Sequence, residues 1–460
     1  MSATGLVSRS LSRMREIVAH ATGKAQEPSE KVLDRIRRQL DECAAGLGGE
    51  ISTRQRAARL ADTYLKLDDN GRRAMLRMIA LDFGPDPTAI AQAHSDYQAA
   101  VGTDQQWDAE ARLRTAMRSR RIRILTQFNA IPQGVKFLVD LRADLLRFLG
   151  DDPLLKPLDR ELEARLGAWF DVGFLELARI TWNSPAALLE KLVEYEAVHE
   201  IQSWQDLKNR LDSDRRCYGF FHPRMPLEPL IFVQVALTEE LAGDVQQLLD
   251  INAPLADASK ANTAIFYSIS ATQVGLRGVS FGNFLLKRVV EDLQRDFPKL
   301  QTFATLSPIP GLVRWASRNP QALTEAITAA DWKRLTAAGV DSPTSPLLGA
   351  LLDGQADWTD NESICRALHD PLQRLAARYL TEARRDDKPI DAVARFHLGN
   401  GARVERLNWL ADKSVKGIKQ SWGLMVNYLY DPDRIESNLE GFAREGRVDA
   451  STAVKRLARR

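Results

Sequence analysis

The sequence has little of what marks disulfide-rich, membrane-spanning or nucleic-acid-binding proteins. Its three cysteines, Cys43, Cys217 and Cys365, are scattered and odd in number, which argues against a disulfide framework or a zinc site. No apolar run approaches the roughly 18 residues of a membrane span, so we expect no membrane partner. The 63 basic and 61 acidic residues leave a net charge of +2, and we therefore expect no nucleic-acid partner.

Metal-ligand patterns are also absent from the sequence. None of the six histidines pairs with another ligand at a spacing such as H-E-x-x-H, so we expect no metal site. His397 is distinguished by its context, F-H-L-G-N-G-A, at the end of an apolar segment and beside two glycines. A lone histidine in such a place is typical of a hydrogen-bonded structural residue.

The most informative stretch of the sequence runs from Ala264 to Gly311. It begins with the apolar, β-branched run A-I-F-Y-S-I-S-A, which predicts a buried strand. A glycine-punctuated loop, T-Q-V-G-L-R-G-V-S-F-G-N, leads into an amphipathic helix that Pro298 ends. A second strand, L-Q-T-F-A-T-L, is followed by a proline-stiffened turn that presents the hydroxyl of Ser307 on a rigid corner.

The glycine loop has two interpretations. Free N–H groups at a helix start and closely approaching glycine backbone suit a pyrophosphate, and Arg277 would add a charged contact. However, the loop lacks both the Walker A ending and the G-x-G-x-x-G spacing, and many such loops are plain turns. From the residues alone, both interpretations stay open.

Four motifs together resemble one enzyme family. The loop R-G-V-S-F-G-N-F-L-L is similar to the pyrophosphate loop of the GNAT acyl-CoA superfamily. The longer run F-Y-S-I-S-A-T-Q-V-G-L-R-G-V-S-F-G-N-F-L-L-K-R-V-V resembles the central segment of malonyl-CoA decarboxylases. T-L-S-P-I-P-G, F-H-L-G-N-G-A and G-L-M-V-N-Y-L-Y resemble the later signature segments of that family, in the same order. The resemblance extends from about Trp169 to about Tyr430.

The resemblance implies a carboxy-lyase that converts malonyl-CoA to acetyl-CoA and CO2, with Ser307 and His397 as a catalytic pair and Tyr430 nearby. The substrate-binding residues it implies are Ser268, Gln273, Arg277, Gly278, Val279, Ser280, Phe281, Gly282 and Asn283. Ser280 stands where some relatives carry an acid. No metal or other cofactor is expected, because the thioester carbonyl itself accepts the electrons. Two alternatives are kept: a GNAT-type N-acyltransferase and a non-catalytic acyl-CoA-binding protein.

The resemblance also implies a homo-oligomer, a dimer or tetramer, whose subunits associate through the N-terminal helices. The C-terminal residues, R-L-A-R-R, differ from the peroxisomal Ser-Lys-Leu signal. The thiols suit a reducing compartment. We expect a bacterial-type cytoplasmic enzyme rather than a mitochondrial one.

The pattern of elements predicts an α+β (mixed α/β) protein. Residues 1–168 read as an α-helical bundle, with helices near 51–67, 71–83, 87–100, 105–127, 133–149 and 157–168. Residues 169–460 read as a GNAT-like catalytic domain with a central mixed sheet. A helical insertion is predicted over 311–381, strands over 393–398 and 404–409, and a closing helix over 434–458.

Overall fold

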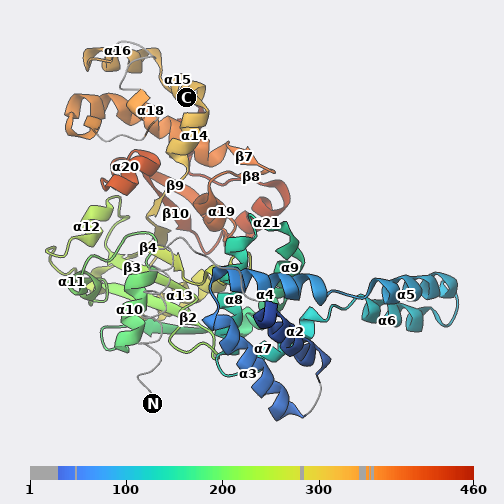
Figure 1. Ribbon diagram of the computed structural model, residues 1–460. Helices are drawn as coiled ribbons and strands as arrows, with labels where there is room; N and C mark the ends of the chain where they lie inside the picture. Colours follow the sequence, from blue (N-terminus) through green and yellow to red (C-terminus); the bar gives the residue numbers. More distant parts are fainter. Residues whose placement is uncertain are drawn as a thin grey trace. The chain divides into compact units, whose positions relative to one another are not determined.

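The computed structural model describes residues 30–46, 49–279, 284–340, 349–351, 353 and 357–459. They group into two compact units, which we call the helical unit and the sheet unit (Figure 1). The helical unit holds the described residues up to 171, together with residues 223–226 and 273–279. The sheet unit holds the remaining described residues.

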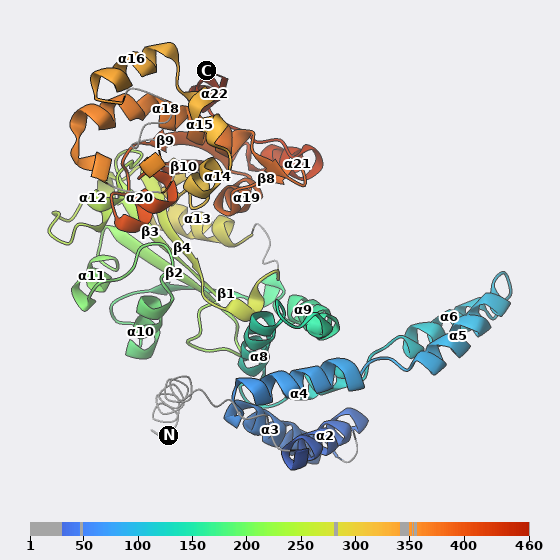
Figure 2. The same cartoon turned by 45° about the horizontal axis from the view of Figure 1, so that its top comes forward.

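The helical unit is built from amphipathic helices whose apolar residues recur three and four positions apart, as Ile36, Leu40 and Cys43 do. The helices are α2 (Glu30–Ala45), α3 (Glu50–Lys66), α4 (Asp69–Asp82), α5 (Pro87–Ala100), α6 (Gln106–Ala116), α7 (Arg121–Asn129), α8 (Gly134–Phe148) and α9 (Lys156–Trp169). Helices α5 and α6 pair as a hairpin that projects from the other helices of this unit (Figures 1 and 2).

One helix predicted in this region is wrong. The helix expected over 105–127 is two helices, α6 and α7, separated by residues 117–120. At the break, the buried Ser119 hydroxyl accepts the N–H of Arg121 (3.0 Å) and donates to Glu161 (2.9 Å). Such local side-chain bonds compete with the helical ladder, so they favour a new helix start here.

The sheet unit contains an eight-stranded mixed sheet. Its strands are β1 (Glu176–Ile180), β2 (Arg215–Phe221), β3 (Ile231–Thr238), β4 (Thr263–Ala271), β5 (Thr302–Thr305), β6 (Ser307–Pro308), β9 (Arg403–Asn408) and β10 (Met425–Tyr430). The order is β1-β2-β3-β4-β5-β10-β6, and β9 also pairs with β10. Only β4 and β5 pair in parallel among these strands. A separate hairpin joins β7 (Arg384–Arg385) and β8 (Lys388–Pro389).

Helix α13 (Phe284–Asp296) connects the parallel strands β4 and β5, which confirms the predicted order of strand, loop, helix and strand. The other helices are α10 (Ala186–Tyr195), α11 (Trp204–Asn209), α12 (Val245–Leu249), α14 (Leu312–Arg318), α15 (Pro320–Ala326), α16 (Ala329–Ala337), α18 (Glu362–Thr381), α19 (Ala392–Leu398), α20 (Val415–Ser421), α21 (Ile435–Glu445) and α22 (Thr452–Arg459). Helices α14, α15, α16 and α18 form the predicted helical insertion (Figure 2). Short 3₁₀ turns are η1 (Pro153–Leu155), η2 (Val172–Phe174), η3 (Ala258–Lys260), η4 (Val274–Leu276) and η5 (Asp357–Asp360).

Two further predictions are wrong in the C-terminal part. Residues 393–398, expected as a strand, lie in helix α19, because the Asp391 carboxylate caps that helix by accepting the N–H of Ala394 (2.9 Å). The closing helix expected over 434–458 is two helices, α21 and α22. Gly446 follows α21 with a left-handed φ of 62°, which ends the helix as glycine commonly does. The strand predicted over 404–409 is confirmed by β9.

No helix within the described ranges is both long enough and apolar enough to span a bilayer.

The start of the glycine loop packs within the helical unit. Gly275 sits so close to helix α8 that a Cβ there would lie 1.8 Å from the Val139 carbonyl oxygen. Arg142, on the same helix and 2 % exposed, donates to the carbonyls of Gly275 (2.9 Å) and Arg277 (2.7 Å) and pairs with Asp159 (2.9 Å). Helix packing therefore accounts for this glycine.

We expect Arg142→Met to lower the free energy of unfolding by on the order of 3–5 kcal/mol, because it strands a buried carboxylate and two carbonyls. Arg147→Met is the matched control: Arg147 lies on the same helix, but its side chain is half exposed in its pairs with Asp69 and Asp144. Arg147→Met should lower the free energy of unfolding by only about 0–1 kcal/mol. Urea titration of both variants measures the difference, and equal losses would contradict the role given to Arg142.

Candidate active site

The antiparallel ladder of β10 gathers several polar side chains on one face of the sheet. Phe303 of β5 pairs with Tyr430 of β10, and Ser307 of β6 pairs with Val426 of β10. Strands β5 and β6 therefore follow the same register along β10. Because side chains alternate along a strand, Thr305 and Ser307 point to the same face. Tyr428 and Tyr430 of β10 share it. Ser307 thus lies within a paired strand, and the prediction that it stands on a turn beyond the strand is wrong.

Strand β4, the parallel partner of β5, stops pairing with it just before Ser307. Its pairing with β5 ends at Phe266 and Thr305, where the N–H of Leu306 donates to the Phe266 carbonyl (3.0 Å). Beyond that point β4 stays paired with β3, whereas β6 stays paired with β10. Strands β4 and β6 therefore diverge from each other at Ser307. The Phe266 ring contacts that of Tyr430, with centroids 6.5 Å apart.

Ser307 and His397 are in hydrogen-bond contact, as predicted for a pair. Ser307 Oγ lies 3.2 Å from His397 Nε2, and the Tyr430 hydroxyl lies 2.7 Å from His397 Nδ1. The imidazole also stacks on the ring of Tyr428, with centroids 4.6 Å apart and planes inclined by 23°. Ser307 Oγ donates to Thr305 Oγ1 (2.8 Å). Four side chains thus form one hydrogen-bonded chain.

Asp391 connects the segments that carry the pair. Its carboxylate caps α19, the helix of His397, and accepts the Tyr379 hydroxyl (3.2 Å) and the backbone N–H of Gly311. Gly311 follows the Ser307-Pro308 strand, and a Cβ there would lie 2.2 Å from the Tyr379 hydroxyl oxygen, so a larger residue would displace this tyrosine from Asp391. Asp391 is 2 % exposed, and burial raises its pKa although these donors oppose the shift.

Burial sets the protonation state of the pair. His397 is 3 % exposed, and desolvation lowers its pKa to about 3, so the imidazole is neutral at pH 7. Desolvation also raises the pKa of Tyr430 well above its usual value, so the phenol is protonated in the resting site. The arrangement is a dry set of neutral hydrogen-bonding groups. Such a set can transfer a proton to a substrate carbon or polarise a carbonyl oxygen.

Ser268, predicted to face the acyl group, lies elsewhere. The register between β3 and β4 shifts next to Gln234, so Ser268 pairs with Gln234 and turns toward the sheet face opposite Phe266 and Thr305. Its hydroxyl donates to Glu196 (2.8 Å), which also accepts from the Gln234 amide (2.8 Å). Ser268 therefore belongs to a separate polar cluster under the loop after α10.

The predicted substrate-binding loop is described only in part. The side chains of Gln273 and Val279 are buried, whereas Arg277 and Gly278 are exposed. Gly278 has a left-handed φ of 88°, which favours glycine there. The other predicted members lie outside the described residues: Ser280, Phe281, Gly282 and Asn283. Their role in holding a pyrophosphate stays a prediction.

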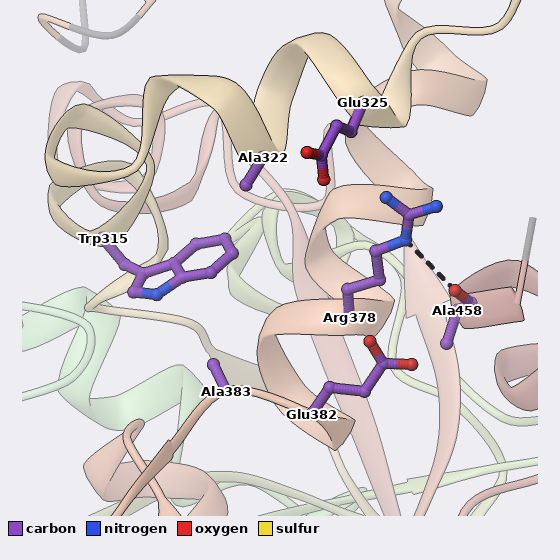
Figure 3. A pocket seen from close by; sticks show the side chains of 7 residues that line it. All are labelled: Trp315, Ala322, Glu325, Arg378, Glu382, Ala383 and Ala458. Atoms are coloured by element: carbon purple, nitrogen blue, oxygen red, sulfur yellow. Dashed lines mark hydrogen bonds between the residues drawn. The ribbon is translucent and has the colours of Figure 1, made fainter.

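The sheet unit also has a surface cavity of about 540 Å³ that none of the catalytic candidates lines. Figure 3 shows the Trp315 indole on one side and the carboxylates of Glu325 and Glu382 around Arg378, whose Nε donates to the Ala458 carbonyl (3.1 Å). Across the described part of the chain, no group of three or more His, Cys, Asp or Glu side chains has the arrangement of a metal site.

Sequence reasoning missed Thr305, Asp391 and Tyr428. Two of them carry a readable signal. Thr305 precedes Ser307 by two residues, which is the spacing of neighbours on one strand face. Asp391 directly precedes the run A-V-A-R-F-H-L, and an aspartate in that place is a helix-start signal.

Comparisons with known proteins agree on one family. The family model for the malonyl-CoA decarboxylase C-terminal domain matches residues 173–460, and the model for the N-terminal domain matches residues 83–170. The chain is 37% identical to mitochondrial malonyl-CoA decarboxylase of Anser anser anser, over 87% of this chain and 82% of that protein. It is also 37% identical to the mitochondrial enzyme of Mus musculus, over 84% of this chain and 81% of that one.

Solved structures give the same result. The crystal structure of malonyl-CoA decarboxylase from Rhodopseudomonas palustris superposes with a TM-score of 0.82 at 40% identity, covering 92% of this chain and 99% of that one. The Agrobacterium vitis structure gives 0.81 at 41% identity, with coverage of 92% and 99%. The matching family model spans more than half of the sequence, and the chain therefore belongs to the malonyl-CoA decarboxylase family.

Proposed function

We propose that this protein decarboxylates malonyl-CoA to acetyl-CoA and CO2, with Ser307 and His397 as the catalytic pair. The observation that carries the proposal is the 3.2 Å contact between Ser307 Oγ and His397 Nε2 in a buried site, in a chain of this family. Loss of CO2 from the malonyl group leaves a thioester enolate, whose charge moves from the carboxylate to the thioester oxygen. The reaction then needs a proton for the enolate carbon.

The residues of the site meet these needs in chemical terms. A buried, neutral His397 holds a transferable proton, and proton transfer by a positioned side chain typically contributes about 10²–10⁴-fold. Ser307 orients the acyl group or polarises its thioester oxygen. We propose that no metal or other cofactor takes part, because the thioester carbonyl accepts the electron pair. Tyr430 assists through its bond to Nδ1.

The nucleotide part of the substrate is assigned to the glycine loop. The exposed side chain of Arg277 beside Gly278 supports contact with a diphosphate, since both are open to solvent at the start of that loop. We further propose a cytoplasmic location. The three buried free thiols support a reducing compartment, and bacterial relatives support the cytoplasm, although two curated relatives are named as mitochondrial.

Ser307→Ala and His397→Asn should each lower kcat by on the order of 10²–10⁴-fold, because each removes one member of the proton-transfer pair. Acetyl-CoA should still raise the midpoint of thermal unfolding of both variants, since nucleotide binding is retained. The measurement is acetyl-CoA formation from malonyl-CoA without any amine present.

Ser317→Ala and His369→Asn are the matched controls and should leave kcat unchanged, because the Ser317 hydroxyl bonds to the Val313 carbonyl (3.0 Å) and His369 Nδ1 contacts Asp370 (2.7 Å), not the members of the pair. Turnover that requires an amine acceptor would instead support an N-acyltransferase. Stabilisation by CoA thioesters without product would support a binding protein. Near-normal turnover in Ser307→Ala or His397→Asn would contradict the proposed pair.

The pH dependence of kcat/KM tests the neutral imidazole. Because the pKa of His397 is lowered to about 3, the free enzyme should show no step near pH 6.5 caused by this group. The inhibition constant of acetyl-CoA, measured over the same range, is the control for titration of the CoA phosphates. A step near pH 6.5 in kcat/KM that is absent from the inhibition constant would contradict a neutral His397.

The pH dependence of the free energy of unfolding is an independent test of the neutral imidazole of His397. An unfolded histidine takes up its proton near pH 6.5, whereas folded His397 does so only near pH 3. The free energy of unfolding should therefore fall as the pH falls through this interval, by at most about 1.4 kcal/mol per pH unit for this histidine. His397→Asn should make the fall less steep. His199, whose pKa burial lowers to about 4, contributes to the fall in both proteins.

We also propose that copies of this chain associate through the α5–α6 hairpin of the helical unit. Val101, Trp107 and Met117 are 56%, 72% and 59% exposed there, and association would remove their apolar surface from water. Trp107→Arg should lower the molar mass measured by light scattering. Trp204→Arg, at an exposed tryptophan of the sheet unit, should leave it unchanged. An unchanged mass for Trp107→Arg would refute this interface.

A further inference from the structure

We infer that Thr305 is a positioning residue that sets the direction of the hydrogen-bond chain through Ser307, His397 and Tyr430. The inference rests on the proposed decarboxylation and goes beyond it, because it says which imidazole nitrogen carries the proton. A serine hydroxyl has one proton to donate. Whether that proton goes to Thr305 or to His397 decides the state of every group further along the chain.

Thr305 is held as a fixed acceptor. It is fully buried, and its Oγ1 accepts both the Ser307 hydroxyl (2.8 Å) and the backbone N–H of Tyr428 (3.1 Å). Its carbonyl accepts the side-chain amide of Asn427 (2.7 Å), which also donates to Ala242 (3.0 Å). Main-chain and side-chain bonds from β10 thus fix Thr305 at both ends, so its hydroxyl oxygen cannot turn away from Ser307.

The direction of the remaining bonds follows from this acceptor. With its own proton directed to Thr305, Ser307 Oγ offers a lone pair to His397, so Nε2 must carry a hydrogen and donate it. The imidazole is neutral, so Nδ1 has no hydrogen and accepts the Tyr430 hydroxyl. The geometry therefore favours the Nε2–H tautomer of His397.

This tautomer places a transferable proton beside Ser307. In the balanced step, the bond to the carboxylate carbon breaks, CO2 leaves, and the electron pair stays on the thioester enolate. The α-carbon then forms a C–H bond with the proton that Nε2 gives up. Tyr430 passes its proton to Nδ1 as Nε2 loses its own, so the imidazole stays neutral. After product release, a proton from water is added at Nε2 and the Nδ1 proton returns to Tyr430, which restores the starting Nε2–H tautomer.

Loss of the Thr305 hydroxyl reverses the direction of the hydrogen bonds through Ser307, His397 and Tyr430. Without that acceptor, the Ser307 hydroxyl turns to the nearest remaining one, which is Nε2 of His397. The imidazole hydrogen then lies on Nδ1 and points to Tyr430. The nitrogen beside Ser307 has no proton to give, although the side chains keep their places.

Thr305→Val and Thr305→Ser form the matched pair for the test, because valine keeps the shape and removes the hydroxyl, whereas serine keeps the hydroxyl. We expect Thr305→Val to lower kcat by on the order of 10–100-fold, part of the usual effect of a positioned acid, with KM changed by less than about threefold. Thr305→Ser should stay within about threefold of the unsubstituted protein. Equal activity of Thr305→Val and the unsubstituted protein would overturn the inference.

Nitrogen NMR shifts of ¹⁵N-histidine-labelled protein supply a readout that packing alone does not move. The signals of His397 are identified by their absence in His397→Asn. The Nε2–H tautomer is expected in the unsubstituted protein and in Thr305→Ser, and the Nδ1–H tautomer in Thr305→Val. An Nδ1–H tautomer in the unsubstituted protein overturns the inference even if Thr305→Val fails to fold.

The two proposals fail separately. If the unsubstituted protein forms no acetyl-CoA from malonyl-CoA, the proposed function is wrong, while the tautomer still reports the role of Thr305. If acetyl-CoA forms but the tautomer is Nδ1–H, the function stands and the role given to Thr305 is wrong.

Discussion

The antiparallel ladder between β10 and the continuous register of β5 and β6 is the constraint on which the site depends. It places Thr305 and Ser307 on the sheet face that also carries Tyr428 and Tyr430. His397 comes from helix α19 instead. Its imidazole stacks on Tyr428, and its two nitrogens are in hydrogen-bond contact with the hydroxyls of Ser307 and Tyr430, which join it to the hydrogen-bonded chain. A slip of one residue in this ladder would turn Ser307 to the opposite face.

Asp391 connects this ladder to helix α19. One buried carboxylate caps the helix of His397 and also accepts the N–H of Gly311, just after the strand of Ser307. The serine and the histidine are 90 positions apart in the chain, and the helical insertion lies between them. A shared anchor lets that insertion vary without separating the pair. The same carboxylate therefore holds both segments of the proposed catalytic pair.

The sequence allowed much of the fold to be predicted, because long periodic patterns dominate local structure. The run from β4 through α13 to β5 is an example. Short elements failed where a single side chain decides the outcome, as Asp391 does for α19 and Ser119 does for the break between α6 and α7. Ser268 failed for another reason: the register shift beside Gln234 turns it to the other face, and the residue pattern does not reveal that shift. Ser307 and His397 were identified by resemblance, whereas Thr305 was missed because the predicted strand ended before Ser307, so the spacing of two residues between them was not used.

A neutral imidazole suits this reaction better than a charged one. Negative charge starts on the malonyl carboxylate and ends on the thioester oxygen. A cation beside the carboxylate would stabilise the starting state, most strongly in a site that excludes water. Burial keeps His397 uncharged, so a proton is available without that stabilisation. The desolvation that makes an unpaired charge costly here also disfavours the substrate carboxylate. In the proposed reaction, the same burial would therefore keep the imidazole uncharged and add to the driving force for loss of CO2.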